Sequence, residues 1–241
     1  MNTIRKIIIS LFLFYSTVSF SSVTMVKTRI IYSSDSRFEI LKFMNNDGIP
    51  YIMQVWADKN NVNSTPDNAD APFIAQPPVF RIEPKTGRDV RLIYSGEGLP
   101  QDRESIFYLN VAQIPPKDLN QDVQDGNSFS VIIRHRLKLF YRPVAIQSEL
   151  NNLEENITFY KEKDGRIRVK NDSPFFVSFS SISVSSQAGK KYEFESMMIP
   201  PLSTEILSMN DKNKLTFSPD KVSYKYINDL GGQNSVENKI H

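Results

Sequence analysis

The chain has 241 residues, with 29 basic and 27 acidic side chains, two histidines and no cysteine. A protein so close to neutral lacks the general positive charge that binds nucleic acid, so we expect no nucleic-acid partner. Without cysteine there are no thiol nucleophiles, disulfides or thiolate metal sites, and His135 and His241 are too few for a histidine triad or metal centre. We therefore expect no enzyme and no cofactor.

The first 21 residues have the pattern of a secretory signal. A short basic start precedes about 14 apolar residues, and Ser19 and Ser21 supply the small side chains of a cleavage site. A spanning helix needs about 20 apolar residues, so a retained membrane anchor is the weaker alternative. We predict that residues 1–21 are a signal peptide. Its removal takes away Arg5 and Lys6, which leaves 29 − 2 = 27 basic residues against 27 acidic ones.

The next 120 or so residues contain short alternating or β-branched runs separated by turn residues, which is the pattern of strands. Trp56, in the third run, is either the buried tryptophan of an immunoglobulin-like sandwich or a generic core aromatic. The polar segment 60–71 is expected to be a mobile loop. The predicted strands cover residues 24–32, 37–44, 49–58, 88–94, 103–114 and 128–143.

A second series of strands follows a hinge near Pro143. Residues 156–171 form a predicted hairpin, in which Asp164 and Gly165 supply type I′ turn chemistry. The last 11 residues are expected to be a frayed tail. Sustained helical periodicity is missing, so the fold class is all-β, with one domain at 22–143 and a second at 144–241. The remaining predicted strands are 173–184, 190–197, 203–209 and 221–228.

The last strand of the first domain, SFSVIIRHRLKLFYRP (128–143), combines an apolar ladder with a cluster of cations. Alternation places Phe129, Val131 and Ile133 on one face, and Arg134, Arg136 and Lys138 follow on the other. Periodicity alone leaves two interpretations open. Either the apolar row is core and the cations form a solvated face, or the strand is a binding site.

Five motifs together resemble those of the PapD-like periplasmic pilus chaperones, over nearly the whole mature chain. The resemblance implies two immunoglobulin-like β-sandwich domains in an L or boomerang arrangement with a cleft between them, and a location in the periplasm. It also implies a chaperone that binds pilus subunits (pilins and adhesin) and delivers them to an outer-membrane usher. The motifs are TRIIY (28–32), PPVFRIEP (77–84), LPQDRES (99–105), KLFYRP (138–143) and YINDLGG (226–232).

The resemblance also assigns roles to residues. Phe129, Val131 and Ile133 match the donor-strand residues, which fill the groove of a subunit whose own sandwich lacks its last strand. Arg29 and Lys138 match the pair of cations that holds the subunit's C-terminal carboxylate. Strict alternation puts this anchor and the donor row on opposite faces, so we predict a local irregularity, or a change of exposed face, between Ile133 and Lys138.

Glu104, Arg142 and Asp229 match an interdomain charge network that fixes the angle of the cleft. The segment 114–129 is a little longer than in the short-loop subfamily, but it lacks the cysteine pair and the long apolar extension typical of the long-loop subfamily, so we assign the chain to the short-loop subfamily. An ATP-binding motif is not found, so release is expected to occur by strand exchange. The exposed edge could also cap itself in oligomers when free. The main alternative is an exported immunoglobulin-like adhesin or binding module.

Overall fold

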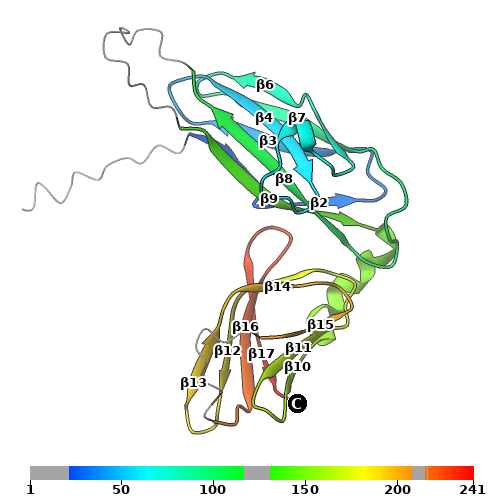
Figure 1. Ribbon diagram of the computed structural model, residues 1–241, viewed down its shortest axis with the longest axis vertical. Coiled ribbons are helices and arrows are strands. Elements are labelled where there is room, and N and C mark those ends of the chain that lie inside the picture. The colour runs from blue at the N-terminus through cyan, green and yellow to red at the C-terminus, as the bar shows by residue number, and fades with distance from the viewer. Residues whose placement is uncertain (1–21, 117–130, 208–214, 216) are drawn as a thin grey trace, which may run out of the picture.

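The computed structural model describes residues 22–116, 131–207, 215 and 217–241. Two β-sandwiches follow one another along the chain and meet in a bent, L-shaped arrangement, joined by a short helical linker (Figure 1). The predicted all-β fold with two sandwiches is confirmed. The predicted signal peptide lies outside the described residues.

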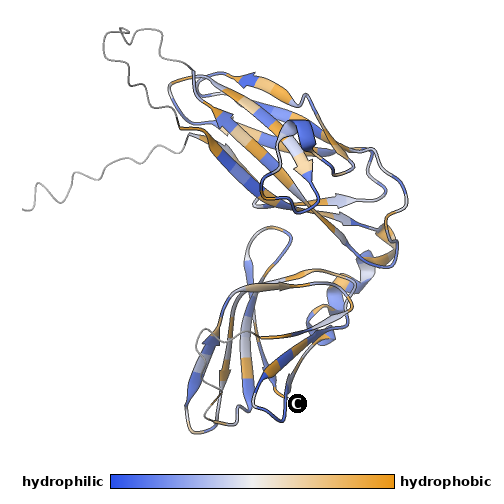
Figure 2. Cartoon of the chain, viewed as in Figure 1, coloured by the Kyte–Doolittle hydropathy of each residue, from blue (hydrophilic) through white to orange (hydrophobic). Residues whose placement is uncertain are grey.

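The first domain packs a four-stranded sheet against a five-stranded sheet around one apolar core. Hydrophobic and hydrophilic residues alternate along many strands in Figure 2, as expected where one face of a sheet lies against a core. The four-stranded sheet has the order β1 (Val23–Met25), β3 (Glu39–Asn45), β7 (Gly87–Tyr94) and β5 (Phe73–Gln76). The five-stranded sheet has the order β2 (Arg29–Ser33), β9 (Ile133–Arg142), β8 (Ser105–Ile114), β4 (Tyr51–Asp58) and β6 (Val79–Ile82).

The second domain has its own core between a three-stranded and a five-stranded sheet. Three short 3₁₀ segments complete the described structure, and no helix in the described ranges has the length and apolarity needed to cross a membrane. The 3₁₀ segments are η1 (Pro66–Asn68) in the first domain and η2 (Val144–Asn152) and η3 (Glu154–Asn156) in the linker. The three-stranded sheet is β10 (Ile157–Lys161), β11 (Ile167–Asn171) and β15 (Ser203–Ile206). The other sheet is β13 (Lys191–Phe194), β12 (Val177–Ser185), β16 (Lys221–Ile227) and β17 (Gln233–Lys239), with β14 (Met197–Ile199) on β12.

The first predicted strand, 24–32, is in fact two strands in different sheets. β1 pairs antiparallel with β3, whereas β2 pairs in parallel with β9. The run TMVKTRIIY contains no glycine or proline that would mark this switch. The pairing of β2 with β9 begins at Arg29 opposite Lys138. Within the described residues, the preceding part of β9, residues 133–137, therefore has a strand only on its β8 side.

Three local predictions are wrong. The expected frayed tail is β17, which pairs with β16 along its whole length; its polar sequence hides the strand because its side chains are exposed or only half-buried. The β10–β11 turn is longer than a two-residue type I′ turn: Lys161 lies opposite Ile167, and only Gly165 has a positive φ. Strands β5 and β6 were missed because they are four residues each and flank Pro77.

One local device recurs in the two domains, at the end of β3 and of β11. Asn45 and Asn171 are both fully buried. The Asn45 amide donates to the carbonyls of Ile49 (2.8 Å) and Glu83 (3.0 Å), and its oxygen accepts from the Asp47 N–H at 2.9 Å. Asn171 makes the same set of bonds to its own neighbouring loops. Each asparagine thus satisfies buried backbone groups at a sandwich end.

Replacement of Asn45 by alanine should lower the free energy of unfolding of the first domain by about 2–3 kcal/mol, because buried backbone groups lose their partners. Trp56 is the only tryptophan and lies in this domain, so its fluorescence during urea unfolding reports the change. The exposed Asn151→Ala is the control and should change the value by no more than about 0.5 kcal/mol. Equal effects of the two substitutions would contradict this role.

Candidate functional site

The free half of β9, which is residues 133–137, and the two residues before it expose apolar side chains. Val131, Ile132 and Ile133 are 56%, 59% and 42% exposed. The interpretation that this row belongs to the protein's own core is therefore wrong for Val131 and Ile133. Phe129 lies outside the described residues. An exposed apolar edge strand is an interaction site or an aggregation hazard unless something pairs with it.

The interior of the first sandwich opens to solvent along this same edge. A groove of about 580 Å³ lies between β1 and the free half of β9. Its walls include the core side chains Phe43, Met53 and Val111, and Ile133 and Leu137 line its β9 side. The odd-numbered residues of β9 thus lead from the exposed edge into the core of the domain. An added strand on this edge could pack against that core.

The structure brings Arg29 and Lys138 together as register partners of the parallel β2–β9 pair. The Arg29 guanidinium donates to the carbonyl of Ile227 at 2.9 Å, and Lys138 Nζ donates to Ser178 Oγ at 3.0 Å. Ile227 and Ser178 belong to the second domain. Both cations therefore lie in the cleft between the domains, at the point where the free edge of β9 ends.

The two cations lie side by side with no carboxylate of the described residues bonded directly to either of them. Among the described residues neither forms an ion pair, and Arg29 Nε is buried without a hydrogen-bond partner. Burial lowers the pKa of Lys138 below its ordinary value, and the neighbouring Arg29 charge lowers it further. Burial also lowers the pKa of Arg29, although Asp229 and Glu104 partly offset this effect. Such a pair favours an anionic ligand, which would relieve both effects.

The predicted interdomain network also comes together. Arg142 Nε donates to Glu104 Oε1 at 2.8 Å, and its two terminal nitrogens donate to the Asp229 oxygens at 2.6 and 2.8 Å. The second oxygen of Glu104 accepts from the Phe176 N–H at 2.8 Å. Arg142 and Glu104 lie in the first domain, and Asp229 and Phe176 in the second. The network therefore joins the domains beside a cavity of about 280 Å³ that Arg29 also lines.

This network determines geometry more than it adds stability. Burial raises the pKa of the Glu104 carboxyl, and this effect exceeds the lowering by Arg142 and by the Phe176 N–H. A buried ion pair of this kind recovers in attraction roughly what it loses in hydration, but it specifies one arrangement. The turn after β16 also contacts the first domain: Gly231 has φ +83°, and a Cβ there would lie 2.4 Å from Thr28 Oγ1. Figure 1 shows this turn pointing toward the first domain.

The expected irregularity in β9 is not found. The strand pairs with β8 in one continuous register, from Ile133 opposite Gln113 to Tyr141 opposite Ser105. Instead, the exposure changes along the strand. Both faces are exposed over residues 133–135, and the inner face is buried only from Leu139 onward. Lys138 therefore lies on the outer face of the same regular strand whose inner face carries the apolar row.

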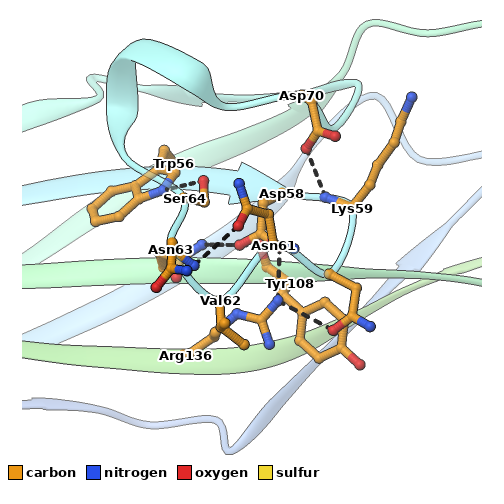
Figure 3. Close-up of polar contacts among 12 residues, drawn as sticks. Trp56, Asp58, Lys59, Asn61, Val62, Asn63, Ser64, Asp70, Tyr108 and Arg136 are labelled. Carbon is orange, nitrogen blue, oxygen red and sulfur yellow. Dashed lines mark hydrogen bonds and ion pairs between the residues drawn. The ribbon is translucent and has the colours of Figure 1, made fainter.

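One polar cluster on the outer face of the first domain was missed. Asp58, Tyr108 and Arg136 meet there beside the loop after β4 (Figure 3). Asn110 donates to Asp58 Oδ2 at 2.6 Å. The segment 60–71 was expected to be a mobile loop, and no role was predicted for Arg136. The signal was present in the sequence as a carboxylate at the end of β4 and alternating arginines in β9, but only the sheet order β9-β8-β4 places them together.

Trp56 belongs to this outer face as well. It is buried, but it lies outside the core cluster and donates from Nε1 to Ser64 Oγ at 3.0 Å. Both predicted interpretations expected Trp56 to be buried, which is confirmed, but neither placed it outside the core cluster on the outer face of the sheet. Its cover is the loop after β4, in which Ser64 is also buried.

Comparison with known proteins identifies the class of protein. The family model for the pili and flagellar-assembly chaperone PapD N-terminal domain matches residues 22–147, and that for the pili assembly chaperone PapD C-terminal domain matches 152–238. The chain therefore belongs to the PapD family of pilus-assembly chaperones, and it is itself a pilus-assembly chaperone. The family is one of chaperones and not of enzymes.

Individual relatives agree with this assignment. The probable fimbrial chaperone YadV of Escherichia coli (strain K12) is 35% identical over 222 residues, which are 90% of this chain and 89% of YadV. The crystal structure of YadV superposes with a TM-score of 0.75 at 31% identity and covers 91% of this chain and 100% of that one. The crystal structure of the Pseudomonas aeruginosa CupB2 chaperone superposes with a TM-score of 0.74 at 28% identity. The match covers 90% of this chain and 100% of CupB2.

Replacement of Arg142 by alanine should lower the free energy of unfolding by about 3 kcal/mol, because Glu104 would be left buried without its cation. Without Arg142, the pKa of Glu104 rises further and the folded state holds a proton that the unfolded state releases. The loss relative to the wild type should therefore be larger near pH 7 than near pH 5. Urea unfolding at the two pH values measures the difference in this loss. The control is Arg166→Ala, which removes an exposed ion pair. A loss that is independent of pH would contradict this account.

Proposed function

We propose that this chaperone binds pilus subunits by lending them the free half of β9 as an additional strand. The observation that carries the proposal is the half-covered edge: residues 133–137 have no strand on one side among the described residues, and the edge ends at two unneutralised cations. An extended segment of a subunit can pair with this edge and complete both sheets. Val131 and Ile133, with Phe129 before them, would enter the subunit's groove.

The apolar row supplies most of the affinity. Burial of each large aliphatic or aromatic side chain contributes about 1.5–3 kcal/mol before the cost of ordering. The backbone of the free edge adds hydrogen bonds that also determine the direction of the incoming strand. Many grooves could accept three apolar side chains, so this row by itself gives modest specificity.

The cation pair determines the register. A carboxylate removed from water needs charged donors, and a guanidinium beside an ammonium provides them. In our proposal Arg29 and Lys138 bind the C-terminal carboxylate of the subunit. A shift of one residue along β9 would turn every apolar side chain to the wrong face, so a fixed end point is required. Glu104, Arg142 and Asp229 hold the cleft at the angle that this end point needs.

The remaining steps are also proposals. Residues 1–21 act as a signal peptide that sends the protein to the periplasm, with domains at 22–143 and 144–241. The segment between β8 and β9 has no cysteine pair and no long apolar extension, which supports the short-loop subfamily. The bound subunit is delivered to an outer-membrane usher and released by exchange of strands. In the free state, the same edge is covered by another copy of the chain in an oligomer.

Replacement of Lys138 by methionine should abolish capture of co-expressed pilins, with at least a tenfold loss of complex, while the fold stays intact. Because protonated Lys138 is disfavoured beside Arg29, its removal should leave the urea midpoint unchanged or higher. Affinity purification measures the complex, and the exposed Lys190→Met is the control. A variant that retains pilins as the wild type does would overturn the anchor.

Binding should also weaken as the pH rises. The carboxylate prefers protonated Lys138, and the pKa of Lys138 in the free protein lies below its ordinary value. Affinity therefore falls as the pH increases through that lowered pKa. A peptide with the sequence of a captured subunit's C-terminal segment is the probe, measured by calorimetry. The same peptide with an amidated C-terminus should bind more weakly and show no such pH dependence; equal behaviour of the two peptides would contradict a carboxylate anchor.

A further inference from the structure

The outer face of the free half of β9 is tied to a single loop. Arg134 and Arg136 alternate on this face, and both reach the loop 59–65 or the residue before it. Arg136 donates to Asp58 Oδ1 at 2.7 Å, and its guanidinium carbon lies 3.7 Å from the centre of the Tyr108 ring (Figure 3). Arg134 donates to the carbonyl of Ser64 at 3.0 Å and to that of Val62.

The partner side of these contacts is rigid. Asp58 is 0% exposed and accepts hydrogen bonds from Asn110 Nδ2 at 2.6 Å and from the Asn61 N–H at 2.8 Å, besides that from Arg136. Burial by itself raises the pKa of the Asp58 carboxyl, but the hydrogen bonds from Arg136 and Asn110 and the charge of Arg136 together outweigh it, so this pKa is lowered. Asp58 is therefore charged at neutral pH, and it faces Arg136 across the strand β8.

The loop itself is bonded to the sheet beneath it. Ser64 is buried and accepts from Trp56 Nε1. Its backbone carbonyl is one of the two acceptors for Arg134. Trp56 and Asp58 thus bind the loop to the sheet. Arg134 and Arg136 link β9 to the same loop and to Asp58. Within the part of the chain that the structure describes, the outer face of residues 133–137 is thus held by the β8 ladder and by contacts with this loop, including that of Arg136 with Asn60 Oδ1.

We propose that Arg134 and Arg136 are positioning residues that hold the lending half of β9 extended before a subunit arrives. The inference rests on the proposed function, because it concerns the strand that is lent. A strand paired on one side, with exposed apolar residues on the other face, frays easily. A strand that is already ordered binds more tightly, because ordering costs are not incurred on binding. The arginines act on the outer face, so they leave the inner row and the free backbone edge accessible.

The test begins with the free full-length protein. In the double variant Arg134→Gln, Arg136→Gln, hydrogen exchange should speed up by about tenfold or more at those amides of residues 133–137 that bond to β8. The amides of 139–141, which lie between β2 and β8, should be unchanged and serve as the internal reference. The urea midpoint should fall only slightly, because Asp58 loses the charge of Arg136 but keeps the hydrogen bonds from Asn110 and from the Asn61 N–H. The control is Arg168→Gln, which removes a strand arginine paired with Glu162 far from this edge.

The second measurement is competition for a co-expressed pilin between the variant and a tagged wild type. The double variant should lose about tenfold in its share of the complex. Arg136→Lys, which keeps the charge facing Asp58, should recover part of this loss. Unchanged exchange over 133–137 would overturn the proposal, as would faster exchange with undiminished capture. A lowered urea midpoint that accounts for the loss would assign these arginines to fold stability and overturn it too.

Parallel use of Lys138→Met separates the two proposals. If that variant retains pilins, or if the wild type captures none, the proposed function fails. The exchange result in the free protein then still decides whether the arginines order β9. If Lys138→Met abolishes capture while the arginine variant binds normally, only the positioning role fails.

Discussion

The half-covered edge of β9 is the constraint on which the rest of the structure depends. β2 pairs with this strand only from Lys138 onward, because the chain before Arg29 crosses to the other sheet as β1. That crossing leaves residues 133–137 paired on one side, and it opens the groove between β1 and β9 to the core. One sheet switch near residue 27 thus creates the free backbone edge, the exposed apolar row and the open seam together. It also puts Arg29 beside Lys138 where the free edge ends.

The two groups of buried charges in the cleft differ in whether their charges are neutralised. The Glu104–Arg142–Asp229 network is internally neutralised except for one negative charge, and its bidentate contacts fix the relative placement of the domains. The pair Arg29–Lys138 is left positive and partly desolvated, which costs stability in the free protein. A site that is unfavourable alone and favourable with an anion is typical of binding and not of folding. The neighbouring network supplies the rigidity that keeps this site from collapsing.

The sequence predicted the parts of this arrangement that local pattern or motif can carry. The all-β class, most strands and the approach of Arg29, Lys138, Glu104, Arg142 and Asp229 were predicted. The break at residues 26–28, the strand β17 and the outer-face placement of Trp56 were not. Each of these depends on which strand lies next to which, and alternation of side chains carries no information about neighbours. Asp58 and Arg136 are 78 positions apart and meet only because β8 lies between their strands.

The regular register of β9 explains why a single strand can carry two kinds of chemistry. With a period of two, the inner face presents apolar residues and the outer face presents cations, and no bulge is needed between them. The outer cations differ in their partners: Arg134 and Arg136 contact the first domain's own loop, whereas Lys138 reaches Ser178 of the second domain. The change of partner occurs where β2 begins to cover the edge. In our proposals, holding the strand and anchoring a partner are therefore separate tasks on one face, divided at the point where the free edge ends.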